Sequence, residues 1–61
     1  MVDVQKLIGM DKQAAIDLLQ SRGLVVRIAM EDGVDNHLQG YSPGRVNLTI
    51  VDGKVTAAEE G

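Results

Sequence analysis

The stretch that decides the fold consists of two apolar segments and the long polar connection between them. The first segment is Leu24-Val25-Val26-Arg27-Ile28-Ala29-Met30, and the last is Val46-Asn47-Leu48-Thr49-Ile50-Val51. Between them lies Glu31-Asp32-Gly33-Val34-Asp35-Asn36-His37-Leu38-Gln39-Gly40-Tyr41-Ser42-Pro43-Gly44, which has neither a helical nor a strand period. Both apolar segments are rich in β-branched residues and predict strands. A loop this long in so small a domain is functional, disordered or a sign of a wrong assignment.

The length of the connection bears on how the two predicted strands pair. Parallel strands need a crossover of about a dozen residues or more, whereas a tight turn can join antiparallel neighbours. The segment from Glu31 to Gly44 is long enough to serve as that crossover, with an extended loop at the edge of the sheet. It is also compatible with a loose, mobile loop between antiparallel strands. Length alone does not separate the two arrangements.

A helix is predicted before the first strand, over Lys12–Arg22. Asp11 is a favourable N-cap residue, because its carboxylate can accept hydrogen bonds from the exposed amides of the first turn. Gly23 stands where a helix ends in the left-handed conformation. The residues that share one face at helical spacing are Ala15, Leu18, Leu19 and Arg22.

The remaining elements complete a small sheet. The nearly continuous apolar run Leu24–Met30 suits a strand that is buried on both faces or central in the sheet. Val46–Val51 alternates, and Asp52-Gly53 predicts a tight hairpin that returns Lys54–Ala57 antiparallel, with Ala58–Gly61 as a tail. We therefore expect one α+β domain over residues 1–61: a single helix packed on a small mixed sheet, with a central parallel strand pair joined by a long extended loop.

Composition and charge argue against several classes of partner and cofactor. The net charge is −3 and the pI is about 4.7. This argues against a nucleic acid as the partner, because nucleic-acid binding depends on Lys and Arg side chains that neutralise phosphates. There is no cysteine and a single histidine, His37, so neither a thiolate metal site nor a histidine-rich zinc site is expected. No apolar run approaches the roughly 20 residues of a membrane span. Val2 to Met10 has no signal-peptide pattern, and the compartment stays open.

An enzyme is not expected either. Asp32, Asp35 and His37 lie together in the polar connection and have side chains suited to acid–base chemistry. A catalytic set also needs a pocket and supporting groups, and no nucleophile stands nearby. A solvated polar loop is the simpler interpretation, so no catalytic residue, metal or cofactor is assigned. Glu59 and Glu60 are interpreted as a solvated tail.

The whole pattern resembles the potato inhibitor I family of serine-protease inhibitors. Leu7-Ile8-Gly9, the predicted helix and Val25-Val26-Arg27-Ile28 look like the first half of that fold. The most specific part is Gly40-Tyr41-Ser42-Pro43-Gly44-Arg45-Val46-Asn47-Leu48. Small bacterial and fungal members typically read Asp-Tyr-Arg-Pro-Asp-Arg-Leu-Asn-Val there. They then turn through a short hairpin and end near a glycine, as this chain does at Gly61.

The resemblance implies an inhibitor of subtilisin- or chymotrypsin-like proteases, a class often exported. The loop between the parallel strands would enter the protease cleft in an extended, substrate-like form. The reactive bond would be Gln39–Gly40, within a reactive loop formed by Leu38, Gln39, Gly40, Tyr41 and Ser42. Arg45 would brace the loop from below by holding loop carbonyls and the chain end together. Asn47 and Gly61 are assigned to the same support.

Three residues depart from the family pattern within this loop. Gly40 stands where an acidic residue usually completes a network with the arginine, Ser42 replaces a common arginine, and Gly44 replaces an aspartate. Each glycine gives the chain more freedom and removes an anchor. Gln39 is neither large and apolar nor basic, so it is a mediocre anchor for a protease pocket. These departures predict that the fold is kept while inhibition is weakened or lost.

A second resemblance suggests a non-inhibitory binding module. Ser42-Pro43-Gly44 and Val46-Asn47-Leu48-Thr49, together with the start of the chain, are similar to PASTA domains of cell-wall-sensing proteins. Those domains place a longer spacer before the last strand, where this chain has only Arg45. They also end at that strand, whereas this chain turns at Asp52-Gly53 and continues. A PASTA-like or other small interaction domain is the alternative function.

Overall fold

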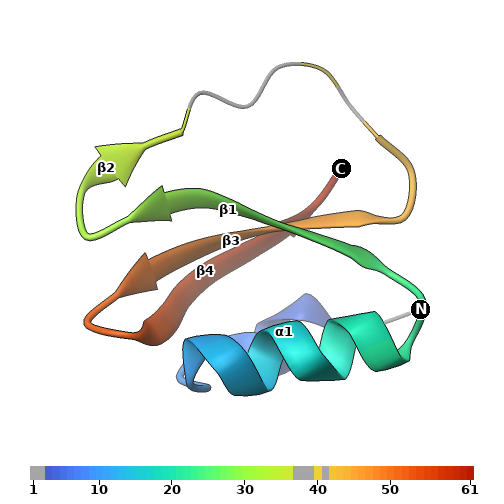
Figure 1. The fold of residues 1–61 in the computed structure, drawn as a ribbon, viewed down its shortest axis with the longest axis horizontal. Helices are drawn as coiled ribbons and strands as arrows, with labels where there is room; N and C mark the ends of the chain where they lie inside the picture. Colours follow the sequence, from blue (N-terminus) through green and yellow to red (C-terminus); the bar gives the residue numbers. More distant parts are fainter. Residues whose placement is uncertain (1–2, 37–39, 41) are drawn as a thin grey trace.

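A computed structural model describes residues 3–36, 40 and 42–61 of the chain (Figure 1). Its elements, in chain order, are η1 (Val4–Leu7, a 3-10 helix), α1 (Lys12–Ser21), β1 (Val25–Glu31), β2 (Val34–Asp35), β3 (Arg45–Val51) and β4 (Lys54–Glu60). Neither described helix is long and apolar enough to cross a membrane. The predicted α+β class, with one α-helix and a small mixed sheet, is confirmed.

The four strands form one sheet in the order β2-β1-β3-β4. β1 and β3 pair in parallel, from Val25 opposite Arg45 to Glu31 opposite Ile50, so the parallel alternative for the central strands is confirmed. The β1–β2 and β3–β4 pairs are antiparallel. The α-helix covers one side of the sheet, and the described ends of the β2–β3 connection lie on the other side (Figure 1).

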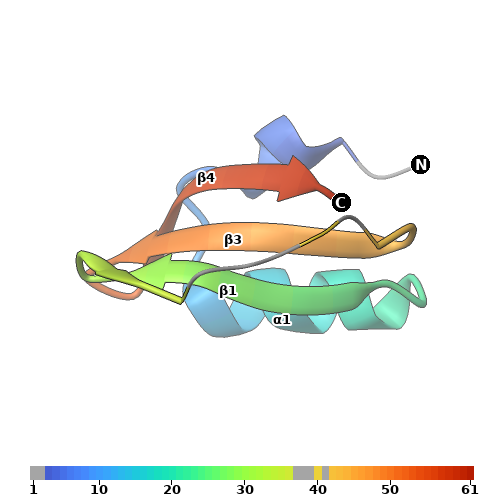
Figure 2. The same cartoon turned by 90° about the horizontal axis from the view of Figure 1, so that it is seen from above.

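The core lies between the sheet and the two helical segments. Seen from above, α1 runs along β1 while η1 lies beside β4 (Figure 2). The fully buried side chains come from η1, α1, β3 and β4: Leu7, Ala15, Leu19, Val46, Leu48, Ile50 and Val55. The predicted alternation of β3 is confirmed, because every second side chain of this strand points into that core.

The first strand is central but not buried on both faces, which corrects one of the two expectations for it. Val25 is 62% exposed, and Arg27 is also exposed. The helical layer covers only one side of the sheet, so apolar residues on the other side of β1 stay near solvent. The pairing with β3 also shifts between Ile28 and Met30, a bulge that the apolar pattern does not reveal.

Asp11 occupies the N-cap position of α1, but its side chain makes no capping hydrogen bond. Its carboxylate instead pairs with the Lys54 ammonium. The main chains of the same two residues form an isolated antiparallel bridge, which brings their side chains together. The capping role expected from the sequence is therefore wrong, because a tertiary contact competes with the local one.

Both Asp-Gly pairs form tight turns between antiparallel strands. Asp52 has φ of 51° in the predicted β3–β4 hairpin, and Asp32 has the same φ in an unpredicted hairpin between β1 and β2. The expected tail is also wrong, since Ala58 to Glu60 belong to β4 and pair with β3. Glu59 and Glu60 remain exposed, as their charge requires.

Two valines of the central strands test this layer arrangement. Val46 is 1% exposed and Val25 is 62% exposed. We expect Val46→Ala to lower the free energy of unfolding by about 2 kcal/mol, because it removes buried apolar area and leaves a cavity. Val25→Ala makes the same chemical change in a neighbouring strand and should cost about 0.5 kcal/mol or less. Urea denaturation measures both, and equal losses would contradict the one-sided core.

Candidate functional site

Arg45, the first residue of β3, lies beneath the end of the long connection. Its Nη2 donates a hydrogen bond to the main-chain oxygen of Gly40 at 2.9 Å and to that of Gly61 at 2.6 Å. The side chain is half-buried, the bond to Gly61 is partly sheltered from water, and the bond to Gly40 is exposed. A charged donor makes stronger hydrogen bonds than a neutral one. One guanidinium group therefore links the connection to the last described residue of the chain.

Gly61 is tied to the same place by its main chain. Its N–H donates to the oxygen of Arg45 at 2.7 Å, and its oxygen also accepts from the N–H of Ser42 at 3.2 Å. The N–H of Arg45 in turn donates to the oxygen of Ser42 at 3.2 Å. Figures 1 and 2 both show the C-terminal end of the chain beside this part of the connection. We call the cluster of Gly40, Ser42, Arg45 and Gly61 the loop base.

The sheet register explains why residues so far apart in sequence meet at the loop base. Antiparallel pairing of β3 with β4 places Glu60 opposite Val46, which brings Gly61 beside Arg45. Parallel pairing places Val25 opposite Arg45, and the N–H of Val25 donates to the oxygen of Gly44 at 2.9 Å. The start of β3 is thus paired with a strand on each side, and this pairing fixes the position of the loop base.

Asn47 follows Arg45 on the same face of β3, since alternate residues of a strand share a face. It is half-buried, and its register partners in β1 and β4 are Arg27 and Glu59. Within the described residues, Asn47 Oδ1 and Arg45 Nε are buried without a hydrogen-bond partner. Burying a polar atom without a hydrogen-bond partner costs about 1–3 kcal/mol of stability. Each of these two atoms can therefore still gain stability by bonding another group or a water on this face.

Two glycines of the connection adopt backbone conformations that side chains disfavour. Gly40 and Gly44 both have φ of 77°, in the left-handed region, and nothing lies within 4 Å of a Cβ built on either. Glycine reaches this region without the strain that other residues meet. These glycines therefore fit the local backbone conformation. This is a second role, beside the extra chain freedom that the sequence predicts for them. The backbone at Gly40 is not in an extended conformation.

The other predicted members of the reactive loop, Leu38, Gln39 and Tyr41, lie outside the described residues. His37 lies outside them as well. Of the predicted site residues, the structure thus brings together Gly40, Ser42, Arg45 and Gly61, with Asn47 adjacent on β3.

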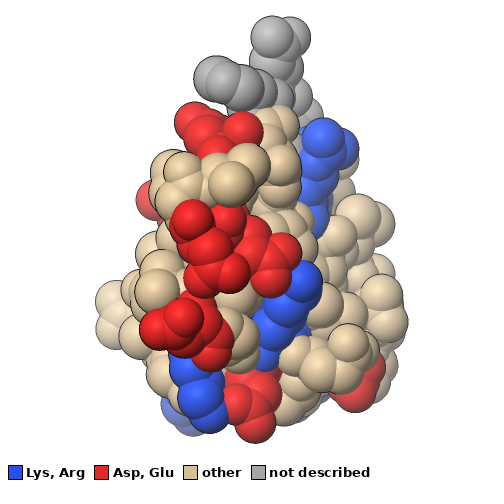
Figure 3. Space-filling model, turned by 60° about the vertical axis from the view of Figure 1, so that its left-hand side comes forward, with Lys and Arg blue, Asp and Glu red and all other residues tan. Residues whose placement is uncertain are grey.

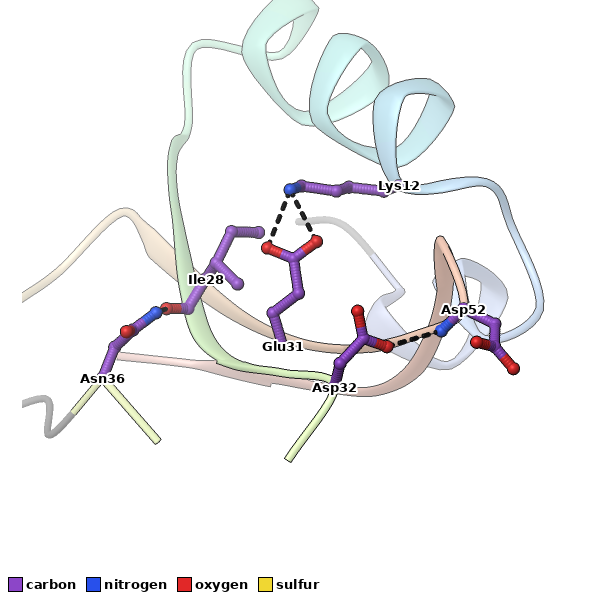
Figure 4. Close-up of polar contacts among 6 residues, drawn as sticks. All are labelled: Lys12, Ile28, Glu31, Asp32, Asn36 and Asp52. Carbon is purple, nitrogen blue, oxygen red and sulfur yellow. Dashed lines mark hydrogen bonds and ion pairs between the residues drawn. The ribbon is translucent and has the colours of Figure 1, made fainter. Parts of the chain in front are cut away.

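A residue that the sequence-based reasoning missed lies at the other end of the connection. The Asn36 side chain donates from Nδ2 to the oxygen of Ile28 at 2.8 Å (Figure 4). The main-chain N–H of Asn36 donates to the oxygen of Ala29 at 2.9 Å. Both acceptors belong to β1. The pattern that could have revealed it is Asp32-Gly33, because a tight turn there folds the following residues back along β1.

Acidic side chains gather at the end of the sheet where the two Asp-Gly turns meet (Figure 3). The Lys12 ammonium bonds both carboxylate oxygens of Glu31 at 2.9 Å, and Asp32 Oδ1 accepts from the N–H of Asp52 at 2.9 Å (Figure 4). The Asp32 carboxylate thus joins the two hairpins. Within the described part of the chain, no group of three or more acidic or histidine side chains is placed to hold a metal ion.

Replacing Arg45 tests the loop base directly. We expect Arg45→Ala to raise the hydrogen-exchange rates of the Ser42 and Gly61 amides about tenfold, because the substitution removes two charge-assisted bonds. Arg27→Ala is the matched control, since Arg27 is exposed on the adjacent strand β1. Exchange measured by NMR should change in the first variant only. Unchanged exchange in Arg45→Ala would contradict the bracing role.

Known proteins provide no relative with which this arrangement of residues can be compared. No protein-family model, curated protein or solved structure matches the chain. The likeness to the potato inhibitor I family therefore stays a prediction from the sequence, and a function has to be argued from the contacts themselves.

Proposed function

We propose that this protein is a serine-protease inhibitor that presents a substrate-like loop to subtilisin- or chymotrypsin-like enzymes. The reactive bond is Gln39–Gly40, in the loop formed by Leu38, Gln39, Gly40, Tyr41 and Ser42. The observation that supports the proposal most is the pair of hydrogen bonds from Arg45 to Gly40 and Gly61. They tie down the residue that directly follows the proposed reactive bond.

An inhibitor of this kind differs from a substrate in what happens after binding. A free peptide loses conformational entropy when it enters a protease cleft, and a loop already held in place loses less. Such a loop binds tightly and leaves slowly. Arg45 and Gly61 restrain the chain from Gly40 to Gly44 through the contacts of the loop base, which supports this type of preorganisation.

The contacts also favour resealing of a cut bond. If a protease cleaves Gln39–Gly40, the new amine belongs to Gly40, whose main-chain oxygen is bonded to Arg45 at 2.9 Å. The chain before the cut continues back to β1, and the chain after it continues into β3. Because β1 and β3 are hydrogen-bonded neighbours, the two ends stay at high effective concentration and can religate.

The same residues argue for modest affinity. Gly40 lacks the carboxylate that would bond Arg45 in the family pattern, and Gly44 lacks another. The left-handed φ of 77° at Gly40 differs from an extended substrate backbone, so binding requires a rotation there. Gln39 offers a polar, uncharged side chain to the primary pocket. We therefore expect slower association and weaker inhibition than a loop with acidic anchors would give.

Inhibition kinetics with subtilisin and chymotrypsin test the proposal. We expect slow, reversible inhibition by the wild-type protein, with a single nick after Gln39 identified by mass spectrometry. Arg45→Ala should be hydrolysed at least about tenfold faster, since its loop loses two charge-assisted hydrogen bonds. Arg27→Ala should behave as the wild type. Rapid digestion of the wild type at several bonds of the connection, without inhibition, would contradict the proposal and favour a non-inhibitory binding module.

A further inference from the structure

The chain enters the long connection through Asn36, which is bonded to β1 by both its main chain and its side chain. β2 pairs with β1 only at Met30 and Glu31, in antiparallel register. The bond from the Asn36 N–H to the oxygen of Ala29 continues that ladder by one position. The side-chain bond to the oxygen of Ile28 reaches one residue further along β1. Asn36 therefore ends the hairpin with two bonds to consecutive carbonyl groups, of which Figure 4 shows the side-chain bond to Ile28.

The bulge in β1 explains why consecutive carbonyls are available to one residue. In a regular strand, successive carbonyl groups point to opposite edges. The register with β3 shifts between Ile28 and Met30, so the ladder is irregular at Ala29. The oxygens of Ile28 and Ala29 can then both accept from Asn36. A side-chain amide suits this place, because it supplies a donor at short reach beside the main-chain N–H.

The residues that anchor the two ends of the connection are bonded to two strands that pair directly with each other. Asn36 is bonded to β1, whereas Gly40 is bonded to Arg45 of β3. β1 and β3 pair directly, with Ile28 opposite Leu48. The positions of Asn36 and Gly40 are thus set relative to each other by the central parallel pair.

We propose that Asn36 is a positioning residue for the reactive loop, and that it acts jointly with Arg45. Asn36 fixes the side of the loop that precedes the reactive bond, and Arg45 fixes the side that follows it. The consequence for inhibition rests on the proposed function, but the restraint on the loop does not. Loss of either side-chain anchor loosens one end of the same segment and increases the range of conformations that the segment samples.

Two substitutions of Asn36 remove the side-chain anchor in different ways. Asn36→Ala deletes the amide, and Asn36→Asp keeps its shape but replaces the donor with an acceptor that repels the oxygen of Ile28. We expect each variant to be nicked in the loop by dilute subtilisin about fivefold faster than the wild type, as the loss of one hydrogen bond implies. Gln13→Ala is the control, since it removes a comparable exposed side-chain bond, to Asp17 within α1. The control should be nicked at the wild-type rate, with a similar change in urea midpoint.

A double variant tests whether the two anchors act on one segment. Once one end is free, release of the other end adds less, so Asn36→Ala/Arg45→Ala should accelerate nicking by less than the product of the single effects. Two independent structural roles would multiply. A multiplicative result, or Asn36 variants that are nicked as slowly as the wild type, would overturn the proposal.

The nicking assay also separates this inference from the proposed function. If the wild type inhibits no protease but the Asn36 variants are nicked faster with the expected coupling to Arg45, the inhibitor function fails and the positioning role stands. If the wild type inhibits and the Asn36 variants inhibit equally well and resist nicking equally, the inhibitor function stands and the positioning role fails.

Discussion

Parallel pairing of β1 with β3 determines the path of the chain and the surroundings of the candidate site. Parallel neighbours cannot be joined by a tight turn, so the chain has to cross back over the sheet in a long connection. With α1 and η1 on one side of the sheet, the ends of this connection lie on the other side. The parallel register places the start of β3 beside β1, and the antiparallel pairing of β3 with β4 brings Gly61 to its other side, so Arg45 can reach both Gly40 and Gly61. The two pairings together produce the loop and its support.

Part of the fold follows from features that can be read locally. The alternation of β3, the hairpin at Asp52-Gly53 and the end of the helix before Gly23 depend on nearby residues and were predictable from sequence. The bulge in β1, the ion pair of Asp11 with Lys54 and the extension of β4 depend on tertiary contacts, and local patterns cannot report them. The β1–β2 hairpin was also predictable from the sequence, because Asp32-Gly33 has the same turn pattern as Asp52-Gly53.

The candidate site, like the fold, contains some features that the sequence predicts and others that depend on tertiary contacts. Arg45 and Gly61 were expected from the resemblance, and the structure brings them into contact at the loop base. The main-chain bond of Asn36 to Ala29 follows from the β1–β2 hairpin, whereas its side-chain bond to Ile28 is a tertiary contact that the turn pattern does not reveal. The glycines at positions 40 and 44 have two effects: they satisfy a left-handed backbone, and they omit carboxylates that could bond the guanidinium. The bonds of Asn36 to β1 and of Arg45 to Gly40 remain as restraints, and the proposed inhibition depends on them.

Resynthesis of the proposed reactive bond, Gln39–Gly40, tests most directly whether the sheet holds both ends of the loop close enough to rejoin. Protein nicked at Gln39–Gly40 is purified and incubated with a catalytic amount of subtilisin, and the intact form is followed by mass spectrometry. We expect intact protein to reappear, and the same ratio of intact to nicked chains to be reached from either starting form. Nicked protein that stays nicked, or is digested further, would show that the sheet does not hold the two ends together.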